Sequence, residues 1–494
     1  MDLIRCIHAA GIVGCGGAGF PTDRKLCGKF RYLIANGAEC EPLLRTDRYL
    51  MREKAPEIVR IMAALAEFLQ VERCVIALKD HYHAELAALR KAVAESGADV
   101  KIFELQNFYP AGDEQMIVRE VTGEIVPPTK IPAAVGAVVD NIATIYAIGE
   151  AMEGKTFTHK YLTVTGEVAH PVVLRVPIGT SLQACIDLAG GATCRNPYIM
   201  TGGPLMGKHV APEAMDTAVV TKTTSGILVL PEGCANESRD RVSVEAMIHR
   251  AKAACIQCTS CTQMCPRHML GHPIEPHRIM RKMALGGDIT EMLSDPIVQS
   301  AQMCCECGVC EVFACPMGLQ PRRINGLLKK ELGKARIRCQ IPEQEYTANP
   351  EREARKVPSR RIAARDGVAK YYDYEITDLI SAEQDTVRIP LQMHIGAPCV
   401  PCVAAGDNCS ISAYLNRSVV INGSNSCINV HLGSRYCVLI CSSGRYAIMD
   451  SGGKCSSDIQ STYIVNFICC NCCNWSFAIF YGQNTLIQDT FIEV

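Results

Sequence analysis

The sequence predicts a multidomain protein of mixed α/β and α+β class, and three observations lead to this prediction. Short apolar runs alternate with helical periodicity over residues 1–155. Residues 156–235 read as a strand pair followed by a short helix. Residues 240–340 hold two regularly spaced cysteine runs joined by helical sequence. At 494 residues the chain is long enough to give each of these units a core of its own.

The first unit has the pattern of a parallel sheet covered by helices. Apolar runs at Tyr32–Ala35, Cys74–Leu78 and Val100–Leu105 have the length of buried strands. Between them, Ile58–Leu69 and Leu86–Val93 carry apolar residues at helical spacing. We expect ligands of such a sheet to bind at the loops beyond the strand ends.

A glycine-rich run, Gly11–Gly19, begins almost at the start of the chain. Glycines let backbone N–H groups approach a phosphate or a flat ring. The run lacks the Gly-Lys-Ser/Thr ending of a P-loop, and by itself it is as compatible with a tight turn as with a ligand site.

Four separated stretches, taken in order, resemble the NADH-oxidising, FMN-binding subunit of respiratory complex I and its relatives. They are Gly14–Lys25, Asn36–Pro42, Tyr109–Glu114 and Val139–Thr144. The resemblance implies a Rossmann-like FMN/NADH domain. By position, it implies the cofactor-binding residues Gly14, Gly16, Gly17, Phe20, Lys25, Asn36, Gly112, Asp113, Asp140, Asn141 and Thr144. It also implies that Phe20 stacks on NADH and that Glu41 and Glu114 are the catalytic carboxylates beside the flavin and nicotinamide.

Two positions depart from that pattern. Ala38 stands where the relatives have an acidic residue, and Leu26 stands where they have an aromatic one. These departures bear on nucleotide affinity more than on flavin binding. Either Glu41 or Glu114 in isolation would be interpreted as a solvated surface carboxylate, and the motif context reverses that interpretation.

The second unit resembles a β-grasp domain of the SLBB type. Tyr161–Val168 and Val172–Pro177 alternate as two strands, and Ser181–Ala189 forms a short helix that ends at a glycine pair. A glycine-rich stretch, Gly202–Gly207, follows. Such a module either binds a ligand or separates the flavin from the metal clusters, and we favour the spacer role.

The two cysteine runs have the spacing of paired [4Fe–4S] motifs. The first run consists of Cys255, Cys258, Cys261 and Cys265, and a proline follows its last cysteine. The second run consists of Cys304, Cys307, Cys310 and Cys315, and a proline follows its last cysteine as well. Two-residue steps let one loop offer three thiolates, and the Cys-Pro cysteine ligates the other cluster. The sequence therefore predicts that Cys315 joins the first three cysteines and that Cys265 joins Cys304, Cys307 and Cys310.

Two zinc sites are the alternative that four-cysteine spacings permit. Three evenly stepped cysteines plus Cys-Pro, occurring twice, favour iron–sulfur clusters. A ninth cysteine, Cys305, lies beside Cys304 and makes the assignment of ligands in the second run ambiguous.

Past the clusters the sequence changes character. Residues 341–386 are polar and charged and are predicted to be a linker with one short helix near Ile362–Val368. Residues 387–494 open like a barrel-sandwich domain of the biotinyl–lipoyl type, with Gly406 and Asp407 closing the recognisable part. The remainder is rich in Ser, Asn and Cys, and we interpret it as a scrambled or frame-shifted terminus without function.

Composition excludes several classes of protein. With 50 basic and 51 acidic residues, the chain shows no bulk charge for nucleic-acid binding. The N-terminus lacks a signal-peptide pattern, and thiolate-bound clusters favour a reducing compartment, so we expect a cytoplasmic protein. Ile459–Gln488 carries no charge, but several asparagines interrupt it, so no stable membrane span is predicted.

The order of the segments separates two related families. In the C subunit of the Rnf electron-transport complex a barrel-sandwich segment precedes the flavin domain, whereas in the cobalamin reductases of propanediol-utilisation microcompartments, the PduS family, it follows the clusters. Here it follows, so residues 11–407 resemble the PduS family. The resemblance implies an NADH-dependent oxidoreductase that passes electrons through FMN and two [4Fe–4S] clusters to cobalamin. Its implied partners are an adenosyltransferase and a shell protein of a bacterial microcompartment.

Two other functions stay open at this point. One is an Rnf-like relay subunit whose electron acceptor is another protein. The other is a zinc-stabilised scaffold in a microcompartment with decayed flavin binding.

Overall fold

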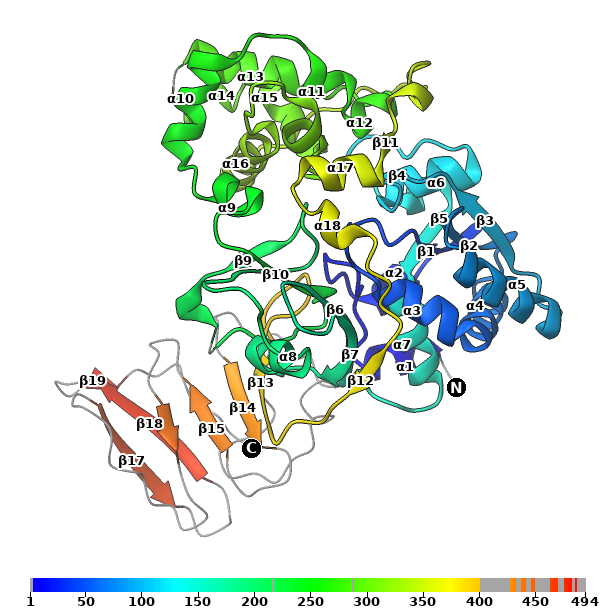
Figure 1. The fold of residues 1–494 in the computed structure, drawn as a ribbon, viewed down its shortest axis with the longest axis vertical. Helices are drawn as coiled ribbons and strands as arrows, with labels where there is room; N and C mark the ends of the chain where they lie inside the picture. Colours follow the sequence, from blue (N-terminus) through cyan, green and yellow to red (C-terminus); the bar gives the residue numbers. More distant parts are fainter. Residues whose placement is uncertain are drawn as a thin grey trace.

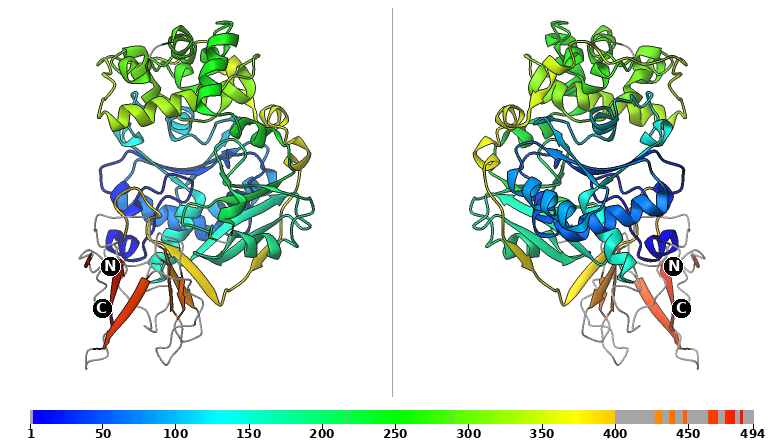
Figure 2. Two further views of the ribbon diagram at one scale, coloured as in Figure 1. Left: turned by 90° about the vertical axis from the view of Figure 1, so that its left-hand side faces the viewer. Right: turned by 90° about the vertical axis from the view of Figure 1, so that its right-hand side faces the viewer.

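The computed structural model describes residues 3–215, 217–286 and 288–399, together with six strands between Cys427 and Leu486. Helices of the cysteine-rich region lie at one end of the molecule, and the six strands lie at the other (Figure 1). Figure 2 shows the same order from two further sides, with the two sheet-containing domains packed side by side in the middle.

The N-terminal domain is built on a four-stranded parallel sheet in the order β3-β2-β1-β5. Its strands are β1 (Tyr32–Gly37), β2 (Arg73–Lys79), β3 (Lys101–Leu105) and β5 (Ala137–Asn141). All three strands expected from the apolar runs are present, and β5 falls in the fourth of the stretches that resemble the complex I protein. This is the predicted α/β architecture.

Helices cover both faces of this sheet. On β1, Leu33 and Ala35 enter one core cluster and Ile34 enters the other, because successive strand residues point to opposite faces. The first face packs against α1 (Leu3–Ala9), α3 (Thr46–Glu53), α4 (Ala55–Leu69), α5 (His83–Ser96) and α7 (Ile142–Met152). The second face packs against α6 (Glu114–Thr122).

The β-grasp domain holds a six-stranded mixed sheet in the order β12-β7-β6-β10-β8-β9. Its own strands are β6 (His159–Gly166), β7 (Val172–Pro177), β8 (Tyr198–Thr201), β9 (Lys208–Val210) and β10 (Gly226–Leu230). Helix α8 (Leu182–Leu188) begins at Ser181, whose Oγ accepts the backbone N–H of Ala184 at 3.1 Å. Its apolar face closes the core over β6 and β7.

The cysteine-rich domain is helical. Its longer helices are α10 (Val244–Ala254), α13 (Pro276–Leu285) and α16 (Pro321–Lys334), which share one apolar core. The short helices are α9 (Ala235–Asp240), α11 (Ser260–Gln263), α12 (Pro266–Met269), α14 (Ile289–Met292) and α15 (Pro296–Gln299). A single π-helical turn at Val309–Ala314 precedes Cys315.

Residues 341–386 differ from the expected linker. Strand β11 (Val357–Pro358) pairs antiparallel with β4 (Phe108–Tyr109) of the first domain, and β12 (Leu379–Ser381) adds a parallel edge strand beside β7. Between them lie α17 (Ser359–Arg365) and α18 (Ala369–Tyr372). The segment is a structured strap across two domains, because its few apolar side chains are buried in them.

The C-terminal part begins with β13 (Thr386–Pro390), at the position where the barrel-sandwich segment was expected to start. It pairs with β14 (Cys427–His431), which is followed by β15 (Cys437–Ile440), β16 (Tyr446–Ile448), β17 (Tyr463–Cys469), β18 (Trp475–Tyr481) and β19 (Thr485–Leu486). The sequence analysis interpreted the tail after Asp407 as a sequence artefact. Apart from these six strands, that tail lies outside the described residues. Within the described chain, no helix has the length and apolar character needed to cross a membrane.

Candidate functional site

A cavity of about 390 Å³ lies at the carboxyl ends of β1 and β5, which are neighbours in the sheet. Because β2 lies on the other side of β1, this junction is the crevice where open α/β sheets bind ligands. Every residue predicted to contact the flavin or nicotinamide lines the cavity: Gly14, Gly16, Gly17, Phe20, Lys25, Asn36, Glu41, Gly112, Asp113, Glu114, Asp140, Asn141 and Thr144.

The glycine loop before α2 (Thr22–Lys25) forms one wall. The backbone N–H of Cys15 donates to Oγ1 of Thr144 at 3.0 Å, which fixes the loop to the start of α7. Gly17 has a φ of +145°, which L side chains rarely adopt, and a Cβ there would meet nothing within 4 Å. A Cβ on Gly16 would lie 3.4 Å from the Cβ of Asn141. The loop therefore presents bare backbone to open space, as binding of a flat ring or a phosphate requires.

Lys25 lies between two carboxylates. Its Nζ is 2.7 Å from Oε1 of Glu114 and 3.4 Å from Oδ1 of Asp140. Burial opposes the charge on Lys25, but Asp140 and Glu114 together raise its pKa. Burial raises the pKa of Asp140, which is 1% exposed, and Lys25 opposes the shift. Apart from the ion pair with Lys25, neither carboxylate oxygen of Asp140 has a hydrogen-bond partner among the described residues. These oxygens can accept hydrogen bonds from a ligand that carries hydroxyl groups.

Two asparagine side chains are held in place at the strand ends. Nδ2 of Asn36 donates to the carbonyl oxygen of Gly112 at 2.8 Å. Oδ1 of Asn141 caps α7 by accepting the N–H of Ala143, and its Nδ2 donates to Asp47 at 2.5 Å. Both amides are therefore oriented before any ligand binds.

Asp113 has a structural role as well as a place in the cavity wall. Its Oδ1 caps α6 by accepting the N–H groups of Gln115 and Met116. Its other oxygen pairs with Arg267 of the cysteine-rich domain at 2.7 Å. Asp113 thus ties the cavity to the first cysteine run.

Glu41 is bound by the β-grasp domain. Its carboxylate accepts the backbone N–H groups of Leu205 at 2.9 Å and Met206 at 3.1 Å. The hydroxyl of Tyr109 lies 3.1 Å from Oε1 of Glu41 and 2.8 Å from the carbonyl oxygen of Cys307. Burial raises the pKa of Glu41 to about 7, although the Leu205 and Tyr109 hydrogen bonds oppose the shift. Glu41 can therefore change charge near neutral pH.

Several lining residues were not predicted from the sequence, among them Asp47, Lys160, Met206 and Cys305. Lys160 comes from β6 and is only 2% exposed. Burial raises the pKa of Asp47 to about 6, opposed by the Asn141 amide and by Lys160. No local motif marks these side chains, and Lys160 lies in a strand that also carries His159, Thr163 and Thr165.

The cavity fits a flavin nucleotide. The glycine loop offers a surface for a ring, the Asp140 oxygens are free acceptors for hydroxyl groups, and Lys25 and Lys160 supply ammonium groups. Ligand cavities commonly measure roughly 300–1,000 Å³. Both its size and its donors and acceptors match FMN.

Thiols of one cysteine run lie near thiols of the other run. Burial and the neighbouring thiols of Cys315, Cys255 and Cys258 raise the pKa of Cys261 to about 12. Burial and the neighbouring thiols of Cys304 and Cys305 raise the pKa of Cys265. Each Cys-Pro cysteine thus lies among the thiols of the other run. In the described chain, no three His, Cys, Asp or Glu side chains converge as ligands of a single metal ion do.

The two sets differ in position. Cys307 is buried, and both it and Cys305 line the flavin cavity. Cys258, in the other set, is exposed. One set of thiols therefore borders the cavity and the other reaches the protein surface.

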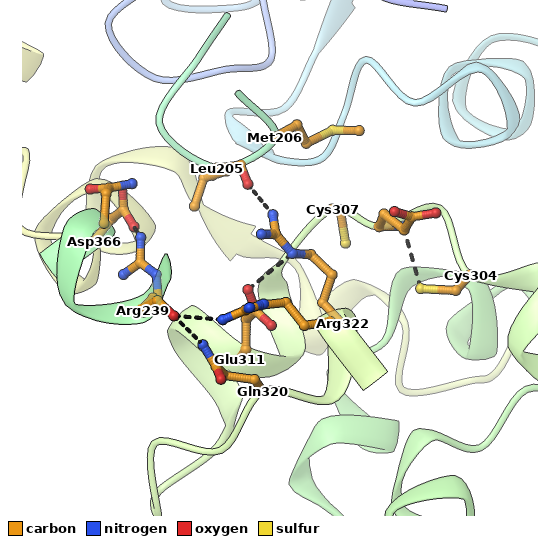
Figure 3. A network of polar contacts seen from close by, with 12 residues as sticks. Leu205, Met206, Arg239, Cys304, Cys307, Glu311, Gln320, Arg322 and Asp366 are labelled. Carbon is orange, nitrogen blue, oxygen red and sulfur yellow. Dashed lines mark hydrogen bonds and ion pairs between the residues drawn. The ribbon is translucent and has the colours of Figure 1, made fainter. Parts of the chain in front are cut away.

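A buried ion-pair network joins the domains beside the cavity (Figure 3). Nε of Arg322 lies 2.9 Å from Oε1 of Glu311, whose side chain is 1% exposed, and the same guanidinium donates to the carbonyl oxygen of Leu205. Arg239 pairs with Asp366 of the strap. The basic stretch around Arg322 is thus partly internal, because it holds the cysteine-rich domain against the loop that binds Glu41.

Three family models match the chain in the order of its domains. The Nuo51 FMN-binding domain matches residues 7–150, the SLBB domain residues 161–208, and the 4Fe-4S dicluster domain residues 254–320. Together with the cavity and the two sets of thiols, they define the chain as a flavin- and iron–sulfur-containing oxidoreductase.

Curated relatives narrow the class to a family. The cobalamin reductase PduS of Citrobacter freundii is 38% identical over 407 residues, which cover 81% of this chain and 87% of the relative. PduS of Salmonella typhimurium is also 38% identical, over 81% of this chain and 86% of its own. The chain belongs to the PduS cobalamin reductase family, as the segment order predicted.

More distant similarities cover part of the chain. The C subunit of the ion-translocating oxidoreductase complex of Edwardsiella ictaluri is 37% identical over 54% of this chain and 32% of its own length. A solved structure of an NAD⁺-reducing [NiFe]-hydrogenase in the H₂-reduced state is 18% identical, with a TM-score of 0.44, over 70% of this chain and 63% of that one.

Proposed function

We propose that this chain transfers electrons from NADH to cobalamin, reducing cob(III)alamin towards cob(II)alamin and cob(I)alamin for reactivation of that cofactor in propanediol-utilisation microcompartments. The observation that carries the proposal is that Cys307, a candidate cluster ligand, lines the same cavity as the candidate flavin residues. The choice of cobalamin is supported by two relatives named cobalamin reductase that match over more than four-fifths of their length.

In this proposal the cavity residues divide into three roles. Asp140, Asn141 and Thr144 bind the flavin from the side of β5, and Gly14, Gly16 and Gly17 bind it from the loop. Phe20, which is half-exposed, stacks against the nicotinamide. FMN, when bound, converts a two-electron hydride donor into a source of single electrons. Glu41 and Glu114 act beside it, and Glu41 is suited to hold or release a proton because its pKa is about 7.

The cysteine sets act in sequence. Cys265, Cys304, Cys307 and Cys310 would hold the cluster that borders the cavity, and Cys255, Cys258, Cys261 and Cys315 the outer one. With clusters bound, the set that borders the cavity would lie on the flavin side, and the set that includes exposed Cys258 would lie on the side of an acceptor.

We further propose domain limits of 1–155, 156–235 and 240–340, followed by the strap at 341–386 and the C-terminal unit from 387. An adenosyltransferase and a microcompartment shell protein are the proposed partners. The proposed location is the cytoplasm, within a microcompartment.

The test is anaerobic NADH oxidation by the purified holoprotein with cob(III)alamin, followed by the corrinoid absorbance spectrum. Cob(II)alamin should accumulate with the protein alone, and adenosylcobalamin should form when an adenosyltransferase and ATP are added. Cys258→Ala should keep dye reduction but lose transfer to cobalamin. Brisk dye reduction by intact protein without any cobalamin reduction would contradict the corrinoid acceptor.

That outcome would favour the second candidate, a relay whose acceptor is another protein. The similarity to the C subunit of the ion-translocating complex supports this candidate, since it spans 54% of the chain. A colourless preparation without flavin or iron would instead favour the zinc scaffold.

A further inference from the structure

A second cavity, of about 260 Å³, lies on the other side of the turn that carries Glu39, Cys40 and Glu41. It shares these three residues with the flavin cavity and is otherwise bounded by the carboxyl end of β2 and by the strap. The other residues that line this second cavity have no role in the proposed binding of the flavin or the clusters. The question is what this space binds.

Lys79 is the last residue of β2 and points into the second cavity. Its side chain is 2% exposed, and its Nζ donates to Oγ of Ser359 on the strap at 3.0 Å. An ammonium group has three donors, and Nζ makes no other hydrogen bond within the described chain, although the Tyr82 ring centroid lies 5.9 Å away. Lys79 also has no ion-pair partner among the described residues. A buried cation in this state lacks the compensation that such groups normally have.

Arg45 adds a second buried cation to the same wall. It is 9% exposed, and its guanidinium donates to the carbonyl oxygens of Leu44, Tyr372 and Tyr374, with no carboxylate partner in the described chain. Arg48 stands nearby and is neutralised by Glu85, from which its Nε is 2.9 Å distant. Among the described residues, two of these three cations, Lys79 and Arg45, therefore lack a carboxylate partner.

The acidic groups of the cavity do not offset them. Burial and the neighbouring Asp47 raise the pKa of Glu39, which favours its neutral form. Glu41, with a pKa of about 7, is bound by the β-grasp loop. On the strap, Asp373 is paired with Arg360 at 2.6 Å, and Glu375 is exposed. Burial and the guanidinium of Arg45 lower the pKa of Lys79, although Cys40 opposes the shift.

We propose that the second cavity binds a phosphorylated small molecule, with its phosphate group between Lys79 and Arg45. A phosphate dianion supplies the charge that both buried cations lack and accepts several hydrogen bonds at once. The cavity is larger than a phosphate group alone requires. The rings of Tyr82 and His81, with centroids 4.6 Å apart, offer a wall for the organic part.

The direct test is calorimetric titration of the anaerobic holoprotein with inorganic phosphate, AMP and adenosine, each in the presence of saturating NAD⁺. NAD⁺ fills the dinucleotide site, so binding that survives its presence belongs elsewhere. We expect one saturable site per chain for AMP, weaker binding of phosphate, and none of adenosine. Lys79→Gln should weaken AMP binding at least tenfold, and Ser359→Ala should weaken it less.

Lys101→Gln is the matched control, because Lys101 is an exposed lysine on neighbouring β3 outside the cavity. It should bind AMP as the wild type does. Absence of saturable binding to the wild-type protein would overturn the proposal even if Lys79→Gln fails to fold. Full competition by NAD⁺ would also overturn it, as would equal binding of adenosine or unchanged affinity in folded Lys79→Gln.

Discussion

Gly16 is a lining residue of the flavin cavity at which an added side chain would occupy ligand space. Its missing Cβ would already touch Asn141, so the branches of a valine would extend into the ligand space. We expect Gly16→Val to lose most of its flavin absorbance while its iron content stays unchanged. Gly333→Val is the control, because Gly333 lies on α16 with nothing near its absent Cβ. Normal flavin content in Gly16→Val would show that the ring does not lie against this loop.

Glu41 should make stability depend on pH. Its folded pKa of about 7 exceeds the ordinary value of 4.5, so the folded state retains a proton that the unfolded chain releases. The free energy of unfolding therefore falls as pH rises from about 4.5 to about 7. Each tenfold difference in proton affinity between the folded and unfolded states changes this free energy by at most about 1.4 kcal/mol. Glu41→Gln removes this dependence, although it also loses one acceptor for the Leu205 and Met206 N–H groups at every pH.

The measurement is the thermal midpoint of both holoproteins at pH 5 and pH 8. On going from pH 5 to pH 8, the thermal midpoint of the wild type should fall relative to that of Glu41→Gln. A difference between the two proteins that is the same at both pH values would mean that Glu41 titrates normally.

At the residue scale, the family resemblance pointed to Asn36 and Asp140, which lie near the carboxyl ends of β1 and β5 and line the cavity. It could not find Lys160, because that lysine reaches the cavity from another domain. Nor could it show that the partners of Glu41 are the N–H groups of Leu205 and Met206. Contacts between residues so distant in sequence leave no local pattern.

At the scale of elements, replacing a buried side chain of the strap tests whether residues 341–386 are a structured part of the fold. Ile362 on α17 is fully buried, so Ile362→Ala should destabilise the protein by about 3 kcal/mol. Ile131 is 63% exposed, so Ile131→Ala should cost less than about 0.5 kcal/mol. Thermal unfolding of the two variants measures the difference. Equal midpoints would mean that 341–386 is the linker predicted from its sequence.

The two cysteine runs give a second test at this scale. Cys258→Ala and Cys315→Ala should abolish the same electron paramagnetic resonance signal of the reduced protein, whereas Cys265→Ala should abolish the other. The reason is that the thiol of Cys315 lies beside that of Cys261. Cys27→Ala, an exposed free cysteine, should change neither signal. Loss of the second-run signal in Cys315→Ala would disprove the crossed pairing.

Elements with a strong local period were predicted well, since β1, β2, β3, α4 and α5 all occur where the apolar pattern put them. The strap was missed for a physical reason. Strands β11 and β12 are only two or three residues long, and each is stabilised by pairing with a strand that is distant in sequence. Such short, charge-flanked segments resemble a linker until their partners are known.

For the molecule as a whole, Arg322 is one of the residues that couple the domains. Arg322→Gln leaves the buried Glu311 without its cation and breaks the contact with Leu205. Removing one partner of a buried pair costs on the order of 3–5 kcal/mol. We expect normal flavin and iron contents but slower cluster reduction by NADH in rapid-mixing experiments. Arg338→Gln, at an exposed position, is the control; equal rates in both variants would exclude this coupling role.

The strap also has a consequence for biosynthesis. Residues 357–358 and 379–381 pair with strands made some 200 residues earlier, so neither sheet-containing domain reaches its final form until the ribosome has passed these positions. Translation proceeds at about 5–20 residues per second, and domains generally fold as they emerge. The nascent N-terminal domain must therefore wait with β4 and β7 lacking their partners. Cofactor loading is expected to follow release of the strap, after the thiols at 255–315 have already emerged.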